Sequence, residues 1–214
     1  SGLIRDPDLA CRIVETVVAA VGLPVTVKTR LGWCGDHNAG GAEAAVNWCR
    51  RLEEAGARML TLHGRTREQR FSGTADWSAI AAVKAALNIP VIANGDVNSP
   101  EEALRCLRIT GADGVMVGRG SMGAPWLVGQ IDAALSDRPI PATPAPRARL
   151  ALAKEQLLAL IEARGDHGLL IARKHMSWTC TGFHGASQFR QQLMRAPTPT
   201  EALHLLDQQM QRIE

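Results

Sequence analysis

The stretch Pro90-Val-Ile-Ala-Asn-Gly-Asp-Val-Asn-Ser-Pro-Glu-Glu-Ala-Leu-Arg-Cys-Leu-Arg-Ile-Thr-Gly-Ala-Asp-Gly-Val-Met-Val-Gly118 decides the fold of this chain. Its two ends, 90–94 and 114–118, are short apolar runs typical of buried strands. Between them Ser99 provides an N-cap, Pro100 takes the first helical position and two acidic residues fill the first turn, which predicts a helix. A strand, a helix and a strand in so short a stretch form a βαβ unit, so we expect a parallel sheet.

The same alternation extends towards the start of the chain. Two more strands are predicted at 25–30 and 58–63, and further helices at 8–20, 42–55, 77–87 and 125–135. Units of this length, with polar residues directly after each strand, are typical of a TIM (β/α)8-type barrel, whose chemistry lies at the carboxyl ends of its strands. Only four strands are present and the chain opens on a helix. We therefore expect an α/β fold made of the last four βα units of such a barrel.

The pattern changes at a proline-rich stretch. Four prolines between Arg138 and Pro146 predict a stiff linker. Beyond it the pattern is helical throughout, which predicts a C-terminal helical bundle. We expect a partial barrel domain over 1–138, a linker over 139–146 and a helical domain over 147–214. The predicted helices of the bundle cover 147–164, 169–179, 186–195 and 200–213.

The composition excludes several classes of protein. With 46% hydrophobic and 21% charged residues, the 214-residue chain can bury a core, unlike a disordered or collagen-like chain. No apolar run approaches the roughly 18 residues that span a bilayer, and no leader opens the chain, so we expect a soluble, cytoplasmic protein. The five cysteines are odd in number and lack a C-x-x-C pair, which favours free thiols over disulfides or a metal site.

The net charge of +3 lies in the last third of the chain. From residue 141 onward nine Lys and Arg residues face six acidic ones, whereas 1–140 is neutral. This asymmetry is a weak sign of a polyanionic partner.

Polar side chains lie in or directly after three of the predicted strands. Lys28 lies within an apolar strand, where it either extends its ammonium to solvent or faces an anionic or electron-rich ligand. His63 ends the next strand, and by itself it is either a hydrogen-bonded structural histidine or a ligand contact. Asn94-Gly95-Asp96 is either a plain β-turn or a place where glycine lets backbone amides approach a ligand closely.

The fourth predicted strand leads into Gly118-Arg-Gly-Ser-Met-Gly123, which fits the G-x-G-x-x-G pattern of dinucleotide-binding folds. A Rossmann unit needs an acid at the end of the next strand, and Asp137, at the right spacing, follows a helix instead. In a (β/α)8 barrel the loops after strands seven and eight bind phosphate, and these would be the third and fourth strands here. Glycine amides at a helix N-terminus and the guanidinium of Arg119 therefore predict a phosphate site.

Five motifs together resemble one family. Val25-Thr-Val-Lys-Thr-Arg30, Leu62-His-Gly-Arg-Thr66, Ile92-Ala-Asn-Gly-Asp96 and Val115-Met-Val-Gly-Arg119 occur in order, and Ile171-Ala-Arg-Lys-His-Met-Ser-Trp178 lies in the helical part. They resemble the bacterial B-type branch of the tRNA-dihydrouridine synthase family, over nearly the whole chain. The resemblance implies an FMN-binding barrel with a helical tRNA-binding domain, which reduces uridine to 5,6-dihydrouridine in tRNA with NADPH as the electron donor.

The resemblance also implies roles for single residues. Lys28 would contact the flavin ring, where a lysine fits because reduced flavin is anionic, and His63 would lie near the flavin and the substrate base. The ribityl phosphate end would be held by Asn94, Gly95, Asp96, Gly118 and Arg119. The tRNA would be bound by Arg173, Lys174 and His175.

The helical periodicity adds an expectation about this triplet. Ile171 and Trp178 are seven residues apart, so both would face the bundle while Arg173 and Lys174 point outward. A charged triplet on an amphipathic helix is otherwise read as a solvated face.

The chain departs from the family pattern in one respect. Members carry four further strands upstream, with a Gly-Cys-Pro motif whose cysteine protonates the uracil ring. None of the five cysteines lies in such a motif, and Cys34 follows the first predicted strand in a different setting, Gly32-Trp-Cys-Gly35. Ser1 in place of a methionine also suggests a fragment. We therefore expect no catalytic residue in this chain, no activity of the chain by itself, and self-association through its open sheet edges.

Two other functions stay open at this point. One is a non-enzymatic half-barrel that binds RNA or a phosphate-bearing ligand, either by itself or as a dimer that completes the barrel. The other is a different FMN barrel, such as a dihydroorotate-dehydrogenase-like enzyme, against which the basic helical tail argues.

Overall fold

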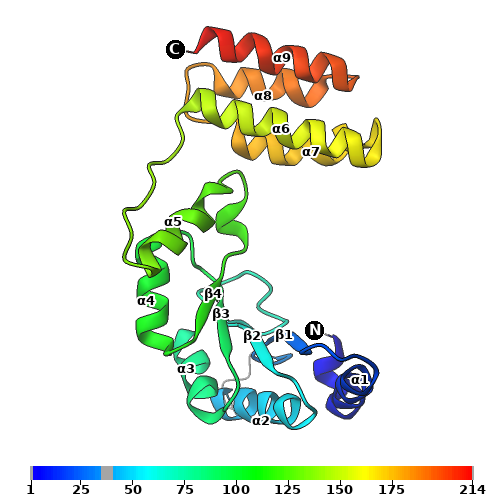
Figure 1. The fold of residues 1–214 in the computed structure, drawn as a ribbon, viewed down its shortest axis with the longest axis vertical. Helices are drawn as coiled ribbons and strands as arrows, with labels where there is room; N and C mark the ends of the chain where they lie inside the picture. The colour runs from blue at the N-terminus through cyan, green and yellow to red at the C-terminus, as the bar shows by residue number, and fades with distance from the viewer. Residues whose placement is uncertain (1, 35–40, 214) are drawn as a thin grey trace. The chain divides into compact units, whose positions relative to one another are not determined.

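The computed structural model describes residues 2–34 and 41–213, and the chain divides into two compact units. The first comprises residues 1–120 and 134–138, and the second comprises 121–133 and 139–214. Ser1 and Gly35, which were named among the departures from the family pattern, lie outside the described residues. Figure 1 shows the elements of each unit.

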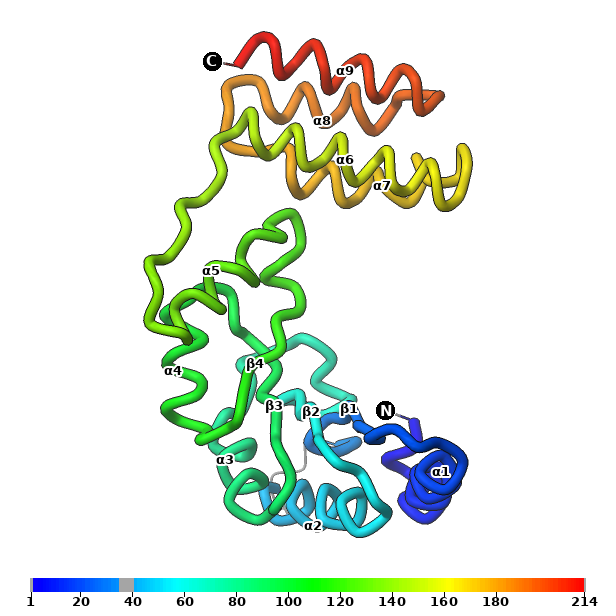
Figure 2. The backbone as a smooth tube through the Cα atoms, viewed as in Figure 1, coloured from blue at the N-terminus to red at the C-terminus, as the bar shows by residue number. Residues whose placement is uncertain are grey.

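Four parallel strands form the sheet of the first unit, in the order β1-β2-β3-β4, as the tube in Figure 2 shows. They are β1 (Thr26–Arg30), β2 (Met59–His63), β3 (Val91–Asn94) and β4 (Gly114–Met116). The predicted parallel α/β sheet is confirmed. The last strand is two residues shorter than predicted, because its partner β3 ends where Gly95 and Asp96 take positive φ angles of 119° and 55° and leave the extended conformation.

Helices alternate with these strands and begin where the sequence provides caps. The side chains of Asp6, Asp76 and Ser99 each accept a hydrogen bond from a backbone N–H three residues on, at 2.9–3.1 Å. Successive helices pack against one another in chain order, the same order as the strands (Figure 1). The elements are η1 (Gly2–Arg5), α1 (Pro7–Ala20), α2 (Gly41–Glu54), α3 (Trp77–Ala86) and α4 (Pro100–Thr110).

Alternation along the strands separates the core of the first unit from its site. Leu60 and Leu62 on β2 are fully buried, and burying such a side chain stabilises the fold by about 1.5–3 kcal/mol. On β1, Thr29 accepts a hydrogen bond from the indole of Trp48 on α2, at 3.0 Å, and so faces the helices. Because side chains alternate along a strand, Lys28 and Arg30 point to the opposite face of the sheet.

The second unit contains the predicted helical bundle. Its helices pack as a closed ring in which α6 contacts α7 and α9, and α8 contacts the same two helices. The core consists of one side-chain cluster that includes Leu150, Met176 and Leu206, and Lys154 pairs with Asp207 between α6 and α9 at 2.6 Å. The bundle helices are α6 (Pro146–Arg164), α7 (His167–Thr179), α8 (Ala186–Arg195) and α9 (Pro199–Arg212), and α5 (Trp126–Leu135) precedes them.

Candidate functional site

Strand register brings the predicted site residues of the first unit together. Arg30, His63, Asn94 and Met116 form one row across the four strands, at or next to their carboxyl ends. Side chains that lie opposite one another in a sheet point to the same face. Arg30, His63 and Asn94 therefore share the face away from the helices, and Lys28, two residues before Arg30, shares it too.

Lys28 and Asn94 are joined across the sheet. The Lys28 Nζ donates to Asn94 Oδ1 at 3.0 Å, and Asn94 Nδ2 donates to the Met116 carbonyl at 2.8 Å, which fixes the orientation of the amide. Burial, and then the nearby Arg30, lower the pKa of Lys28 below its ordinary value. Of the two interpretations of Lys28, the structure supports the one in which the ammonium turns into the site rather than away from it.

Gly95 and Asp96 make a turn with a specific purpose. An added Cβ at Gly95 would lie 2.8 Å from the Ala75 Cβ and 2.9 Å from the His63 Cδ2, so the backbone passes closer to these groups than another residue would permit. The Asp96 carboxylate accepts from the Ala75 N–H and from Arg65, both at 2.7 Å. Burial acts to raise the pKa of Asp96, but these bonds and the nearby arginines outweigh it and hold that pKa below its ordinary value.

Arg65 is a site residue that we did not single out from the sequence. It is only 1% exposed, and its guanidinium donates to the carbonyls of Ser72 and Gly73 at 3.2 and 2.6 Å besides its ion pair with Asp96. It thereby holds the loop between β2 and α3 against the loop after β3. The signal was present in the motif Leu62-His-Gly-Arg-Thr66, because an arginine directly after a buried strand needs a partner.

Two more side chains near the strand ends, those of Phe71 and Arg30, were also not singled out from the sequence. Phe71 is 57% exposed, and the guanidinium carbons of Arg119 and Arg30 lie 4.5 and 5.7 Å from its ring centroid. The Arg30 side chain also donates to the carbonyls of Thr66 and Arg70, at 2.7 and 2.9 Å. Arg119 in turn lies 3.4 Å from Asp96. Phe71 thus offers its ring to the guanidiniums of both Arg30 and Arg119 through cation–π contacts.

The site as a whole is cationic. It includes Lys28, Arg30, Arg65 and Arg119, and two of these, Arg65 and Arg119, pair with the Asp96 carboxylate. Burial lowers the pKa of His63 to about 4, with Arg30, Lys28 and Arg65 adding to the effect and Asp96 opposing it, so His63 is neutral near pH 7. A cluster of this charge suits a ligand that carries phosphate or develops negative charge.

The glycine-rich stretch after β4 only partly forms the expected phosphate loop. It enters a short 3-10 helix, η2 (Arg119–Ser121), so the helix N-terminus next to Gly118 belongs to this short helix, and α5 begins at Trp126, one residue after the predicted start. Gly120 is required because a Cβ there would lie 2.8 Å from the Val97 carbonyl. At Gly118 an added Cβ would meet nothing within 4 Å, so close packing does not require glycine there.

In the second unit the predicted RNA-binding triplet is divided by its surroundings. Lys174 is exposed, as expected. Arg173 does not point outward: it donates to the Ala196 carbonyl at the end of α8, at 3.1 Å, and its Nε is buried. Trp178 is 38% exposed rather than packed in the bundle, and its ring stands edge-on to His175 with centroids 5.4 Å apart. The expected orientation is thus wrong for Arg173, whose guanidinium binds the carbonyl at the end of α8, and for Trp178, whose ring stays exposed.

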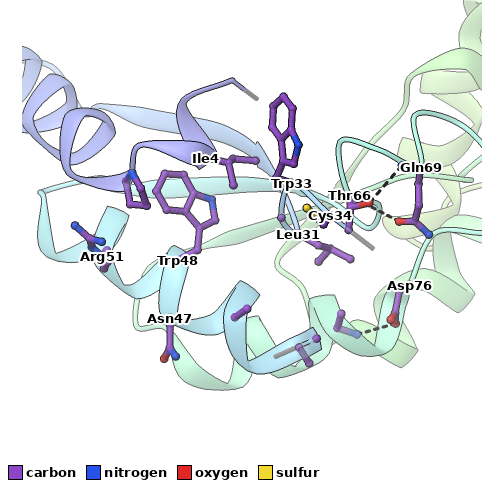
Figure 3. Close-up of a pocket in the computed structure, with 16 residues that line it drawn as sticks. Ile4, Leu31, Trp33, Cys34, Asn47, Trp48, Arg51, Thr66, Gln69 and Asp76 are labelled. Carbon is purple, nitrogen blue, oxygen red and sulfur yellow. Dashed lines mark hydrogen bonds between the residues drawn. The ribbon is translucent and has the colours of Figure 1, made fainter. Parts of the chain in front are cut away.

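A cavity of about 610 Å³ lies elsewhere in the first unit, among α1, α2 and the loop after β1. Figure 3 shows Ile4 and Trp48 on one side of it and Thr66 and Gln69, which hydrogen-bond to each other, on the other. None of the predicted cofactor-binding residues is among the described residues that line it. We therefore place the candidate site at the strand ends and not in this cavity.

The described thiols differ in their surroundings. Burial raises the pKa of Cys49 and Cys180 to about 12 and that of Cys106 to about 11, which makes all three poor nucleophiles and poor acids. The Cys11 Sγ contacts the Arg51 carbonyl at 3.6 Å, and Cys34 is exposed in the loop after β1.

Two further properties concern all the residues that the structure describes. Within 2–34 and 41–213, no three His, Cys, Asp or Glu side chains come together as a metal site would require. Over the same residues, no helix combines the length and the apolar character needed to cross a membrane.

The fold and the site define an α/β protein with a cationic binding site at the carboxyl ends of parallel strands, followed by a helical bundle. The family model described as "Dihydrouridine synthase (Dus)" matches residues 1–214. The chain belongs to the dihydrouridine synthase family, which confirms the resemblance seen in the five motifs.

Individual relatives agree with this assignment. The chain is 51% identical over 209 residues to "Probable tRNA-dihydrouridine synthase 1" of Synechocystis sp., covering 97% of this chain and 57% of that protein. It is 47% identical to a "Probable tRNA-dihydrouridine synthase" of Rhodobacter capsulatus, covering 96% and 62%. It is 41% identical to "tRNA-dihydrouridine synthase B" of Xanthomonas campestris, covering 96% and 60%. The chain thus spans about three fifths of the length of these relatives.

Similarity to solved structures is weaker. A crystal structure of mandelate oxidase aligns over 92% of this chain and 59% of its own, with a TM-score of 0.41 and 20% sequence identity. A likeness of this degree carries no inference about activity.

Proposed function

We propose that this chain forms the second half of the barrel and the helical domain of an FMN-dependent tRNA-dihydrouridine synthase. Residues 1–138 would supply the last four βα units, residues 147–214 the tRNA-binding domain, and 139–146 the linker. The reaction would reduce uridine to 5,6-dihydrouridine in tRNA, in the cytoplasm, with NADPH as the electron donor. Family membership supports the reaction, and the observation that carries the site is the 3.0 Å bond between Lys28 Nζ and Asn94 Oδ1 across three strands.

The side chains at the strand ends fit FMN by their chemistry. Only Arg65 and Arg119 pair with Asp96, so Lys28, Arg30, Arg65 and Arg119 together leave excess positive charge for a phosphate dianion and for a ring system that becomes anionic on reduction. Asn94, Gly95, Asp96, Gly118 and Arg119 would hold the phosphate end, and Lys28 and His63 would meet the ring. When bound, FMN would supply the hydride that reduces the uracil ring.

The chain's own residues would prepare this site. Asn94 holds the Lys28 ammonium in place, so the positive charge needs no reorganisation when negative charge develops beside it. Asp96 orients Arg65 and Arg119 through its two oxygens. Neutral His63 contacts the ligand without adding a further cation.

The buried thiols and the cysteine motifs of the sequence argue against a catalytic acid in this chain. The three buried ones have raised pKa values, and neither Cys11 nor Cys34 lies in a Gly-Cys-Pro setting. We therefore propose that the 214-residue chain by itself does not form dihydrouridine, since a positioned acid contributes about 10²–10⁴-fold to such a step.

The test joins this chain to the part of its Synechocystis relative that the chain does not cover and assays the product on unmodified tRNA. We expect bound FMN by absorbance and dihydrouridine by mass spectrometry with NADPH, and no dihydrouridine from the 214-residue chain alone. Lys28→Met should slow flavin reduction more than it weakens flavin binding, because the ammonium stabilises charge that develops only on reduction. Arg119→Ala should lower FMN affinity, and the exposed Arg108→Ala on α4 serves as its matched control.

Three outcomes would contradict parts of this proposal. Equal reduction rates for Lys28→Met and the parent would remove Lys28 from the reaction. Turnover by the chain alone that disappears in Cys34→Ala would make Cys34 the acid. Binding of RNA or phosphate-bearing ligands by the joined protein, without flavin or dihydrouridine, would favour the non-enzymatic half-barrel.

A further inference from the structure

Arg65 and His63 form a buried pair whose chemistry is more constrained than that of the rest of the site. His63 is 7% exposed and Arg65 is 1% exposed. The Arg65 NH1 lies 3.4 Å from the His63 Nε2, while the other nitrogens of the guanidinium are bound to Asp96 and to the carbonyls of Ser72 and Gly73. The guanidinium is therefore held on several sides and cannot turn away from the imidazole without losing these bonds.

This contact determines where the imidazole carries its proton. A guanidinium has only donors and keeps its charge at any ordinary pH, so the His63 Nε2 must be the acceptor. A neutral imidazole that accepts at Nε2 carries its hydrogen on Nδ1.

The backbone of Gly95 holds the ring in this orientation. An added Cβ at Gly95 would lie 2.9 Å from Cδ2 and 3.3 Å from Nε2, so this edge of the ring is covered by Gly95 and Arg65 together. Nδ1–H is then the donor that His63 has left for a ligand.

The charged groups around His63 also oppose its protonation. Lys28 and Arg30 face it from β1 and Arg65 faces it from its own loop, whereas Asp96, from the loop after β3, is the single carboxylate among these groups. Protonation would place a fourth positive charge in a buried space that already holds three, and it would turn the Nε2 acceptor into a donor aimed at another donor.

We propose that Arg65 is a positioning residue that holds His63 as a neutral, Nδ1-protonated imidazole, so that His63 serves the site as a hydrogen-bond donor and not as its acid. The role in catalysis rests on the proposed function, whereas the state of the imidazole is a property of the chain itself. It follows that the proton added to a reduced base comes from a group other than His63.

The test is a pH titration of the ¹⁵N-histidine-labelled 214-residue chain by long-range ¹H–¹⁵N NMR, with His63 assigned by its loss in His63→Gln. We expect the Nδ1–H pattern for His63 and no protonation between pH 7.5 and about 5.

In Arg65→Met the His63 pKa should rise towards its ordinary value of 6.5, because a cation is lost while Asp96 remains, and the two tautomers should mix. Arg65→Lys should keep most of the pKa depression but lose the single tautomer. Arg70→Met, an exposed arginine of the same loop, is the matched control and should leave His63 unchanged.

The parent spectrum alone can overturn the proposal. A His63 that titrates near pH 6.5, or that carries its hydrogen on Nε2, would contradict it even if Arg65→Met fails to fold. A folded Arg65→Met with parent-like His63 signals would show that burial, without Arg65, determines the pKa and the tautomer of His63. The measurement uses neither flavin nor tRNA, so a failure to bind FMN or to form dihydrouridine would count against the proposed function and leave this result standing.

Discussion

At the scale of single residues, the site depends on a few side chains that satisfy one another across loops. Asp96 accepts from Arg65, Arg119 and the Ala75 N–H, and Asn94 accepts from Lys28 while donating to the Met116 carbonyl. Buried or half-buried charges persist only when they are paired in this way, because each would otherwise lose its hydration without compensation.

The pKa of His63 predicts how stability responds to acid. Its native value of about 4 lies below the ordinary 6.5, so between these values the unfolded chain takes up a proton that the native chain does not. The free energy of unfolding should therefore fall as pH drops from about 6.5 to about 4, by up to about 1.4 kcal/mol per pH unit from this group. His63→Gln, which does not titrate but can still accept from Arg65, should show a flatter profile in urea denaturation.

The titration of Asp96 does not overlap the pH range in which His63 affects stability. Its pKa is held below the ordinary 3.8, so the stability that it contributes is lost only at lower pH, outside the window of His63. Identical pH profiles for His63→Gln and the parent between pH 7 and 4 would show that His63 titrates normally.

Gly95 offers a second test at this scale. Gly95→Ala should destabilise the chain in two ways, through its φ of +119° and through a Cβ placed 2.8 Å from the Ala75 Cβ. We expect a loss of about 2–4 kcal/mol, from backbone strain of about 1 kcal/mol and overpacking of about 1–3 kcal/mol. Gly73→Ala is the control, because Gly73 has a φ of +65° with nothing within 4 Å and should lose only the strain. Equal losses in urea denaturation would remove the close approach from the explanation.

At the scale of elements, the structure separates two cations that the sequence pairs. Lys174 on α7 is exposed, whereas neighbouring Arg173 binds the carbonyl that ends α8. Neighbouring residues of α7 thus have different roles, since Lys174 is a candidate RNA contact and Arg173 links α7 to the end of α8. The glycine-rich loop shows a similar contrast, because a Cβ at Gly120 would lie 2.8 Å from the Val97 carbonyl whereas one at Gly118 would meet nothing within 4 Å.

This separation gives a prediction for RNA binding. Lys174→Ala should weaken tRNA binding and reduce the salt slope by about one, with unchanged stability, because a phosphate contact releases counterions. Arg173→Ala should in addition destabilise the bundle by about 1–3 kcal/mol, since it leaves the Ala196 carbonyl without its donor. Filter binding over a range of salt and urea denaturation measure the two effects. If Lys174→Ala changes tRNA binding no more than Arg164→Ala, an exposed control on α6, the RNA contact lies elsewhere.

At the scale of the whole molecule, the first unit leaves apolar surface without a partner among the described residues. One face of α1 exposes Leu9, Ile13 and Val17, and Val21 at its C-cap is exposed as well, each by 37–44%. In the described sheet, β1 and β4 each have a neighbour on one side only. Surfaces of this kind pair with other chains when nothing covers them.

We therefore expect the 214-residue chain to self-associate. Ile13→Lys combined with Val17→Lys should shift it towards the monomer in sedimentation equilibrium, with little change in stability because both side chains are exposed. Leu170→Lys, at a 52% exposed position on α7, is the control and should leave association unchanged. A monomeric parent at high concentration would contradict the prediction, and an unchanged double variant would move the contact to the strand edges.

The sequence by itself determined the elements and their kind. Hydrophobic periodicity, caps such as Ser99 and the polar residues after each strand predicted the four parallel strands and the helices, because these signals act over a few neighbouring residues. The five motifs identified the family, and they named Lys28, His63, Asn94 and Asp96 as parts of one site. The structure adds the strand register, which places Arg30, His63 and Asn94 in one row.

Tertiary structure alone decided which side chains satisfy which. The burial of Arg65, the protonation of His63, the contacts of Phe71 and the inward turn of Arg173 depend on groups that are distant in sequence: Asp96, Lys28, Arg119 and the Ala196 carbonyl. Local sequence patterns do not predict such partners, because a charged side chain pairs with any counter-charge or carbonyl that the folded chain brings within about 3 Å. Composition and spacing set where a site forms, and packing across loops sets the charge and the proton that each of its groups carries.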